Sequence, residues 1–265
     1  MSLSSVSRKD QTILGFDITT LTSYLAAYSF KLSDSKLIKD LGSSGASADG
    51  DTIAKVKEWS NNGRDLVNTN GTDKPVVNGG LLKFDGVDDY LQCVDFNSSS
   101  GLPEITIGIR FSIDSAPANQ GNGSRIWSWD ASTLFDYLSP SGLSTIQYSS
   151  NQSQFEYFTV YDNSGGFTAN MMTDPSNIQS AYGTFHTFIF IYSTTNGGWY
   201  VDGQSKRANN LGSVSKEIKN FAISTCRTGS GISQGYSPIT IARMYIQATA
   251  ATSTEAANGK AWLEG

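Results

Sequence analysis

The chain has 265 residues, a formal net charge of −5 and a pI near 4.9, and it is long enough to bury the core of one β-rich domain or of two smaller ones. Its 19 basic residues are scattered, which argues against a nucleic-acid partner, because a phosphate-binding face needs clustered Lys and Arg. The longest apolar stretch, residues 188–192, is the length of a strand and far shorter than a membrane span, so membrane insertion is not expected.

Both ends of the chain resemble residues derived from an expression vector. Residues 1–3 and 264–265 are therefore left outside the predicted domain, which spans residues 4–263. The N-terminus lacks the basic-then-apolar layout of a signal peptide, although cloning could have removed a natural one. The compartment therefore has to be inferred from other features.

Strand-forming stretches follow one another along the chain, beginning with residues 24–31. The clearest spans residues 104–114, where Ile and Phe alternate with Thr, Gly, Arg and Ser. This period of two predicts one buried face and one solvated face in an antiparallel sheet. The stretches 155–161, 185–192 and 239–247 are apolar on both faces, which predicts central strands or strands with a covered second face.

Two dipeptides predict hairpin turns. Asn62-Gly63 and Asp202-Gly203 both tolerate positive φ, as tight hairpin turns require. Residues 199–207 therefore resemble a strand, a two-residue turn and a second strand.

One helix is predicted, at the C-terminal end over residues 252–263. Thr252 and Glu255 have the spacing of a capping box, and Gly259 limits the helix to a short one. Many short strands joined by polar turns, with this single helix, predict an all-β fold consisting of one antiparallel β-sandwich domain.

The two cysteines, Cys93 and Cys226, are too few for a disulfide framework. Both lie in or at the end of predicted strands, which favours buried thiols over a single bridge. With one histidine, His186, and no CxxC motif, a His-rich zinc site is excluded. His186 is expected to be a hydrogen-bonded structural residue, because no nucleophile motif accompanies it.

An acidic turn, DGVDD at residues 85–89, places three carboxylates within five positions. Asp side chains accept hydrogen bonds from nearby backbone N–H groups and so fix tight turns. Calcium needs about 6–8 oxygen ligands, which one short turn seldom supplies. We expect a structural corner and no required cofactor; a Ca²⁺ ion at Asp85, Asp88 and Asp89 is the alternative.

Several motifs together resemble one family. The strand LAAYSFK is followed by VKEWSNNGRDLV, by LLKFDGVDDYL and, much later, by WYVDG and ITIARMYIQ. From about residue 25 to residue 263 this order resembles the laminin-G-like, concanavalin A-like jelly-roll sandwiches of bacterial surface and phage virion proteins. The FDGxDDYL motif with an upstream W-x-N-x-G is its most specific part.

The resemblance implies two antiparallel sheets, one of them concave, and binding of glycans or proteins, in some members with calcium at the loop rim. The chain has Asn61 and Ala242-Arg243 where many relatives carry an acidic residue and Ala-Glu, so no metal ligand is carried over. Glucanases of this fold carry E-x-D-x-E or E-x-D-x-x-E, and neither string occurs here. Because glycoside hydrolysis needs two carboxylates about 5–10 Å apart, an enzyme is not expected.

Two stretches carry the polar and aromatic groups that hold sugars. Residues 127–137 place Trp127 and Trp129 on one face of a strand, and residues 161–170 form a Gly-rich loop. Large aromatic residues usually fill a core, which is favoured for Trp127, whereas core and ligand roles are balanced for Trp129. The predicted ligand-binding residues are Trp129, Asp130, Asp136, Tyr137, Asp162, Asn163 and Asn170.

The sequence therefore predicts a non-catalytic carbohydrate-binding or adhesion module that is extracellular, on a cell surface or in a virion. Its partner would be a glycan or another cell-surface polymer, and an oligomer is compatible with the sequence. A structural virion or surface-assembly protein is the first alternative, because the Ser-, Thr-, Asn- and Gly-rich composition fits it as well. A glycan hydrolase is the second and least favoured alternative.

Overall fold

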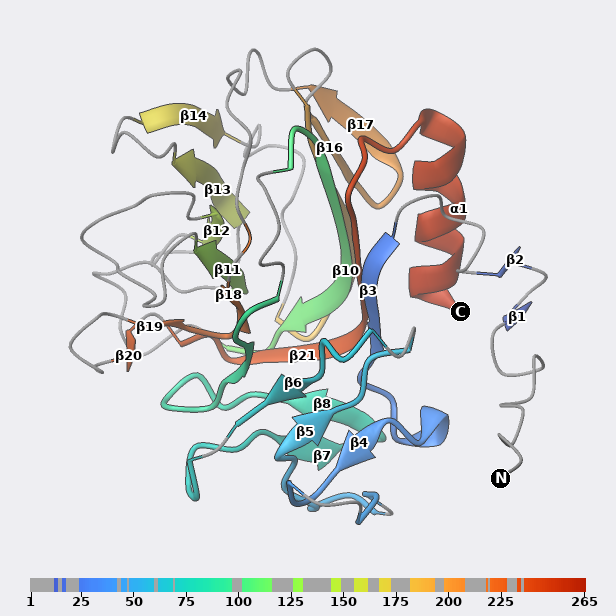
Figure 1. The fold of residues 1–265 in the computed structure, drawn as a ribbon. Coiled ribbons are helices and arrows are strands. Elements are labelled where there is room, and N and C mark those ends of the chain that lie inside the picture. The colour runs from blue at the N-terminus through green and yellow to red at the C-terminus, as the bar shows by residue number, and fades with distance from the viewer. Residues whose placement is uncertain are drawn as a thin grey trace.

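A computed structural model of the chain describes residues 24–41, 44–46, 48–59, 62–68, 70–96, 102–115, 126–130, 182–193, 198–207, 220–227 and 236–265, together with residue 218 and the short strands at 12–13, 16–17, 144–148, 155–161, 167–172 and 233–234. Within these residues the chain forms two facing antiparallel sheets and one helix that lies outside them (Figure 1). The predicted all-β antiparallel sandwich with a short C-terminal helix is confirmed.

The larger sheet has eight strands. In spatial order they are β17 (Gln204–Arg207), β16 (Gly198–Val201), β15 (Phe185–Tyr192), β10 (Ile105–Ile113), β21 (Ile239–Gln247), β8 (Leu81–Lys83) and β7 (Val76–Asn78), with β3 (Tyr24–Ser29) also paired to β21. The long central strands of this sheet include the predicted two-sided stretches 185–192 and 239–247.

The facing sheet has six strands: β11 (Trp127–Asp130), β18 (Asn220–Ile223), β9 (Leu91–Cys93), β6 (Leu66–Val67), β5 (Lys55–Val56) and β4 (Leu37–Ile38). A separate sheet of three strands follows β11 along the chain: β12 (Ser144–Tyr148), β13 (Phe155–Tyr161) and β14 (Phe167–Met172). The pairs β1 (Thr12–Ile13) with β2 (Phe16–Asp17) and β19 (Cys226–Arg227) with β20 (Ser233–Gln234) complete the strands, and a 3₁₀ turn spans Leu32–Asp34.

The core lies between the two large sheets. The alternating Ile and Phe residues of β10 all face it, as predicted. Trp127 of the six-stranded sheet is fully buried, and its ring lies 5.8 Å from that of Phe188 in the eight-stranded sheet. Trp127 is therefore a core residue, the role that the sequence favoured for it.

The second face of β10 is covered, whereas the sequence predicted that it would be solvated. The Thr106 hydroxyl donates to the Thr249 carbonyl at 2.7 Å and accepts from the Ala251 amide at 2.9 Å. Gly108 lies directly against the Tyr245 ring, where a Cβ would come within 2.2 Å of a ring carbon. The short polar side chains of this face leave room for the segment that leads into the C-terminal helix.

That helix, α1 (Ser253–Glu264), begins with the predicted capping box. The Thr252 hydroxyl accepts from the Glu255 amide at 3.2 Å, and the Glu255 carboxylate accepts from the Thr252 amide at 2.8 Å. The glycine at position 259 lets the helix lie close to the Tyr245 side chain, because a Cβ at this position would lie 2.3 Å from the Tyr245 hydroxyl. Among the described residues, no helix has both the length and the apolar character needed to cross a membrane.

Arg243 fastens α1 to the eight-stranded sheet. It is 1% exposed, its Nη1 donates to the Trp262 carbonyl at 2.6 Å, and its Nη2 lies 3.5 Å from the Asp34 carboxylate. Its guanidinium also lies 5.2 Å from the centre of the Trp262 ring, within cation–π range. The middle of β21 therefore holds a buried, paired cation.

The last helical residue, Glu264, was left outside the predicted domain, yet it takes part in the fold. Its carboxylate accepts from the Thr187 hydroxyl at 2.9 Å and from Lys260 at 2.5 Å. These bonds hold the pKa of Glu264 below its usual value, against the opposing effect of burial.

Both predicted turns occur in antiparallel connections. Asp202 and Gly203, with φ of 51° and 86°, form the two-residue turn between β16 and β17. Asn62 and Gly63 lie in the longer connection between β5 and β6. Gly63 has a φ of 76°, so it supplies the backbone conformation that the sequence indicated.

Cys93 is buried in the core as a free thiol, in line with the sequence prediction. Burial raises the pKa of this thiol to about 12, so it is protonated at neutral pH. The side chain of Cys226 lies outside the described residues, so the prediction for that thiol stays open.

Candidate functional site

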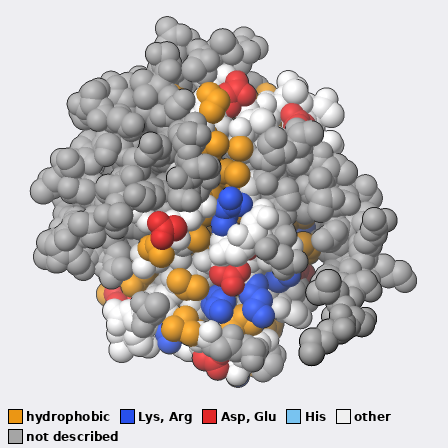
Figure 2. Space-filling model, in the orientation of Figure 1, with side chains coloured by type: hydrophobic (Ala, Val, Ile, Leu, Met, Phe, Trp, Pro, Cys, Tyr) orange, Lys and Arg blue, Asp and Glu red, His pale blue; other side chains and the backbone are white. Residues whose placement is uncertain are grey.

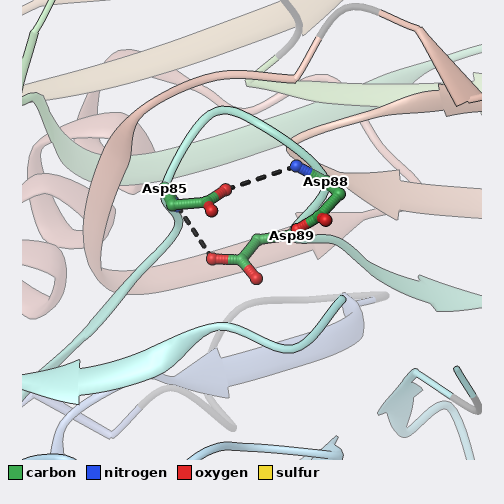
Figure 3. A group of neighbouring side chains, drawn as sticks. All are labelled: Asp85, Asp88 and Asp89. Atoms are coloured by element: carbon green, nitrogen blue, oxygen red, sulfur yellow. Dashed lines mark hydrogen bonds between the residues drawn. The ribbon is translucent and has the colours of Figure 1, made fainter. Parts of the chain in front are cut away.

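In the acidic turn between β8 and β9, carboxylates accept hydrogen bonds from backbone amides of the same turn (Figure 3). The Asp85 carboxylate accepts from the amides of Val87 at 2.7 Å and Asp88 at 3.3 Å. The Asp89 carboxylate accepts from the Asp85 amide at 2.8 Å. Two of the three carboxylates therefore fix the turn, which is the arrangement expected of a structural corner.

The turn also packs against the start of β21. Gly86 has a φ of 80°, and a Cβ there would lie 2.6 Å from Pro238 Cδ. Next to it, the Phe84 amide donates to the Ile239 carbonyl at 2.8 Å. The corner thus holds β8 and β21 in register at one end of the eight-stranded sheet.

The three carboxylates of the turn lie close enough to repel one another. One carboxylate oxygen each of Asp85, Asp88 and Asp89 lies within 4.8 Å of the others. The pKa of Asp89 is raised to about 7, mainly by burial and also by the charges of Asp85, Asp88 and Asp73, against the opposing effect of the bond from the Asp85 amide. A proton on Asp89 or a bound cation would relieve this repulsion.

Three carboxylates are the right donors for calcium, because it prefers oxygen ligands. They supply about half of the 6–8 ligand atoms that the ion takes. Two of them already accept backbone hydrogen bonds, and the Asp89 side chain is buried. Calcium at this turn therefore stays a prediction.

The Asp89→Asn variant is expected to remove part of the pH dependence of stability. The folded pKa of Asp89 is near 7 and the ordinary value is 3.8, so the folded protein binds more protons than the unfolded chain between these values. Stability should therefore fall as pH rises from about 4 to about 7, and it should fall less in Asp89→Asn. Urea unfolding from pH 4.5 to pH 8 measures both slopes.

The matched control is Asp95→Asn, at an exposed position outside the turn, which should keep the wild-type slope. Equal slopes for wild type and Asp89→Asn would contradict the proton assignment. If calcium takes the place of the proton, adding CaCl₂ at pH 8 should stabilise the wild type and leave Asp89→Asn unchanged.

His186 has the structural role predicted for it. Its Nδ1 lies 2.7 Å from the Asp202 carboxylate, whose other oxygen accepts from the Thr187 amide at 2.8 Å. The bonds from His186 and Thr187 lower the pKa of Asp202 against the opposing effect of its burial. The contact of His186 with Asp202 therefore stabilises the turn between β16 and β17.

The predicted sugar-binding side chains lie outside the described residues. This applies to Asp136, Tyr137, Asp162 and Asn163 entirely, and to the side chains of Trp129, Asp130 and Asn170, whose backbones are described. Their role stays a prediction.

The pairing of β12, β13 and β14 nonetheless shows at which end of the three-stranded sheet segments 131–143 and 162–166 join the strands. Ser144, the first residue of β12, lies opposite Val160 of β13, and Tyr161 lies opposite Phe167 of β14. The segment that enters β12 and the connection between β13 and β14 therefore start from the same end of the three-stranded sheet. Asn170 lies opposite Thr159, a short way inside that end.

The register also separates the two predicted residues of β11. Trp129 lies opposite Phe221, which in turn lies opposite Cys93, and both of these are core residues. Asp130 lies opposite Asn220. Because directly opposed residues share a face of a sheet, the position of Trp129 belongs to the core row and that of Asp130 to the outer row.

Sequence reasoning did not foresee the buried role of Arg243. The signal was a single charged residue in the middle of the otherwise apolar strand ITIARMYIQ, since an unpaired charge is costly to bury. Gly108, alone in an alternating strand, was a second signal, because a strand glycine often marks the close approach of another group.

No protein-family model matches the chain, and no curated protein sequence does. Solved structures do match. A Trypanosoma rangeli sialidase in complex with sialic acid has a TM-score of 0.59 at 15% identity, over 97% of this chain and 36% of the sialidase chain. The receptor-binding domain of botulinum neurotoxin D has a TM-score of 0.59 at 10% identity, over 91% of this chain and 52% of the other.

The ligand-binding domain of botulinum neurotoxin serotype D, in complex with N-acetylneuraminic acid, has a TM-score of 0.58 at 11% identity, over 91% of this chain and 51% of the other. The chain thus spans about a third of the sialidase and about half of the neurotoxin chains. At these identities the likeness concerns the fold.

Proposed function

We propose that the chain is a non-catalytic carbohydrate-binding module of the laminin-G-like type, part of an extracellular, cell-surface or virion protein. The observation that carries this proposal is the fold shared with a neurotoxin domain whose structure contains a bound sugar, N-acetylneuraminic acid. Two antiparallel sheets form a scaffold, and on such scaffolds binding residues are commonly carried by the loops at the strand ends.

The proposed binding rim lies at one end of the three-stranded sheet β12–β14. The strand ends next to segments 131–143 and 162–166 meet there, and these segments contain Asp136, Tyr137 and Asp162. Aspartate accepts hydrogen bonds from sugar hydroxyls and asparagine can both accept and donate them, while an aromatic ring covers the apolar face of the sugar. Trp129 is a weaker member of this set because of its position in the core row.

The absence of catalysis is part of the proposal. Among the described residues, the one group of three close carboxylates is the acidic turn, whose oxygens lie within 4.8 Å of one another. Retaining and inverting glycosidases place their two carboxyl groups about 5–5.5 Å and 6.5–9.5 Å apart, with the substrate between them. In this turn the carboxylates instead accept bonds from the backbone.

A glycan array tests the proposal with the intact protein and the variants Tyr137→Ala and Asp162→Ala. We expect the wild type to bind a defined set of glycans, and each variant to lose about tenfold in affinity, the effect of one or two lost hydrogen bonds or a stacking contact. The matched control is Tyr182→Ala, an aromatic residue that is 40% exposed and lies outside these segments.

The proposal fails if the folded wild type binds no glycan on the array, or if Tyr182→Ala loses as much affinity as the two rim variants. A fluorogenic sialoside is the matching test of the non-catalytic assignment. We expect no release of the fluorophore above the buffer rate, and turnover would assign the chain to the glycosidases instead.

A further inference from the structure

The connection between β5 and β6 covers the outer edge of β3. Among the described strands β3 pairs with β21, and its other edge faces residues 58–59 and 62–64, here called the β3 cover. The Trp59 amide donates to the Ala27 carbonyl at 3.0 Å, and the Glu58 carboxylate accepts from the Ala27 amide at 3.4 Å. Both groups with which Ala27 could pair to another strand are therefore occupied.

A second backbone group of this edge, the Leu25 carbonyl, is bonded by side chains of the β3 cover. Arg64 Nη1 donates to it at 2.6 Å, and Asn62 Nδ2 donates to it at 3.4 Å. Gly63 lies between these two residues with a φ of 76°, so the chain turns there and both neighbours reach the same carbonyl. The turn at the end of the W-x-N-x-G motif thus places two donors on the edge of β3.

Arg64 also joins the two large sheets. Its Nε donates to the Phe96 carbonyl at 2.6 Å, and its guanidinium lies 5.5 Å from the centre of the Phe96 ring, within cation–π range. Phe96 follows β9 of the six-stranded sheet, whereas Leu25 belongs to the eight-stranded sheet. The Tyr28 hydroxyl, from β3, donates to the Arg64 carbonyl at 2.6 Å. Loss of the Arg64 side chain would therefore release the β3 cover from both sheets.

The outer edges of β7 and β4 are covered differently, by backbone pairing. The Val77 amide donates to the Asp51 carbonyl at 2.9 Å, and the Val77 carbonyl accepts from the Gly50 amide at 2.8 Å. Residues 44–46 pair with β4 in the same way. Backbone pairing depends little on which side chains are present, whereas the cover of β3 depends on the side chains of particular residues.

The sequence of β3 favours pairing with copies of itself. Its six residues, YLAAYS, include no charged residue, Pro or Gly. Short uncharged segments of this kind pair readily with another chain when their edge is open. Charged side chains are another common protection of edges. In Figure 2 the Lys, Arg, Asp and Glu side chains lie among apolar ones in the centre and lower half, and β3 contributes none of them.

We propose that the β3 cover prevents this edge from pairing with β3 of a second copy of the chain, and that Arg64 is the residue on which this protection depends. An open edge strand presents unpaired N–H and C=O groups to which another strand can add. The groups of Leu25 and Ala27 recur every second residue, as an antiparallel partner strand requires. This inference is independent of the proposed carbohydrate-binding function.

Sedimentation velocity over a concentration series tests the proposal on the full chain. We expect Arg64→Ala to associate at a concentration about tenfold lower than the wild type, the effect of one or two backbone hydrogen bonds made available to a partner. The matched control is Lys57→Ala, which removes a cation from the same connection. Lys57 bonds to the Lys36 carbonyl through its backbone amide, so this variant should associate as the wild type does.

Hydrogen–deuterium exchange distinguishes edge pairing from partial unfolding. In Arg64→Ala, peptides that cover residues 24–29 should exchange faster than in the wild type at low concentration and slower again as the protein associates. Association without this protection would overturn the proposal, and so would association no stronger than that of the wild type. Equal association of Ile223→Ala, a destabilising change in the core of β18, would also overturn it, because partial unfolding would then be the cause.

Asn62→Ala tests the same edge if Arg64→Ala does not fold. Asn62 is exposed and its side chain donates to the same Leu25 carbonyl, so the variant removes one donor and no core contact. We expect the concentration at which it associates to fall about twofold, with the same protection of residues 24–29. An unchanged association of this variant, together with a failure of Arg64→Ala to fold, would contradict the proposal.

Discussion

Replacing Trp262 with alanine is expected to lower the free energy of unfolding by about 3–5 kcal/mol, as truncation of a buried Trp or Phe typically does. The indole is fully buried between α1 and the eight-stranded sheet. Its ring meets Trp59 at 6.4 Å and Tyr245 at 6.3 Å, both edge-on, and the Arg243 guanidinium lies over it. Truncation leaves a cavity beneath a helix that is too short to be stable alone.

Urea unfolding monitored by far-UV circular dichroism measures this loss. Trp262→Phe is the control, because it keeps an aromatic ring against Trp59 and Tyr245, and it should lose about half as much or less. If Trp262→Ala loses under about 1 kcal/mol, α1 does not form a packed layer on the eight-stranded sheet.

Replacing Gly86 with alanine is expected to cost about 2–5 kcal/mol for two separate reasons. A φ of 80° is unfavourable for any residue with a Cβ, by about 1–2 kcal/mol. The new Cβ would also lie 2.6 Å from Pro238 Cδ and 2.7 Å from Pro238 N, and such overpacking costs about 1–3 kcal/mol. The backbone of Pro238 cannot rotate away, so the corner itself has to shift.

Gly63→Ala separates the two contributions. Gly63 has a similar φ of 76°, and no atom of the described residues lies within 4 Å of the place that a Cβ would take, so this position reports the backbone cost alone. We expect Gly63→Ala to lose about 1–2 kcal/mol and Gly86→Ala clearly more, in the same urea experiment. Equal losses of unfolding free energy would mean that Pro238 does not crowd a side chain at position 86.

The sandwich was predictable because β10 has a period-two pattern, the other long strands are strand-length apolar stretches, and the turns use residues that accept positive φ. The covered second face of β10 was not predictable from alternation, since Thr, Gly and Ser suit both solvent and close packing. The position of α1 shows that this face is packed and not solvated, because the Thr106 hydroxyl bonds to the segment that leads into α1. The buried charge of Arg243 depends in the same way on partners far away in the sequence.

The acidic turn was predictable in its role because its hydrogen bonds are local. Asp85 and Asp89 bond to amides within four residues of themselves, which a sequence pattern can encode. The raised pKa of Asp89 was not predictable, because burial is its largest cause and burial depends on the whole fold. For the proposed sugar-binding rim, the residues were predicted from the sequence, and the strand register shows the common end of the three-stranded sheet from which their segments start.

Hydrogen–deuterium exchange with and without a glycan selected on the array tests the central claim most directly. If the rim binds the glycan, exchange should slow in peptides that cover residues 131–143 and 162–166, while the acidic turn at residues 85–89 should be unchanged. Protection at the acidic turn, or on the α1 side of the eight-stranded sheet, with none in the two rim segments, would contradict the claim.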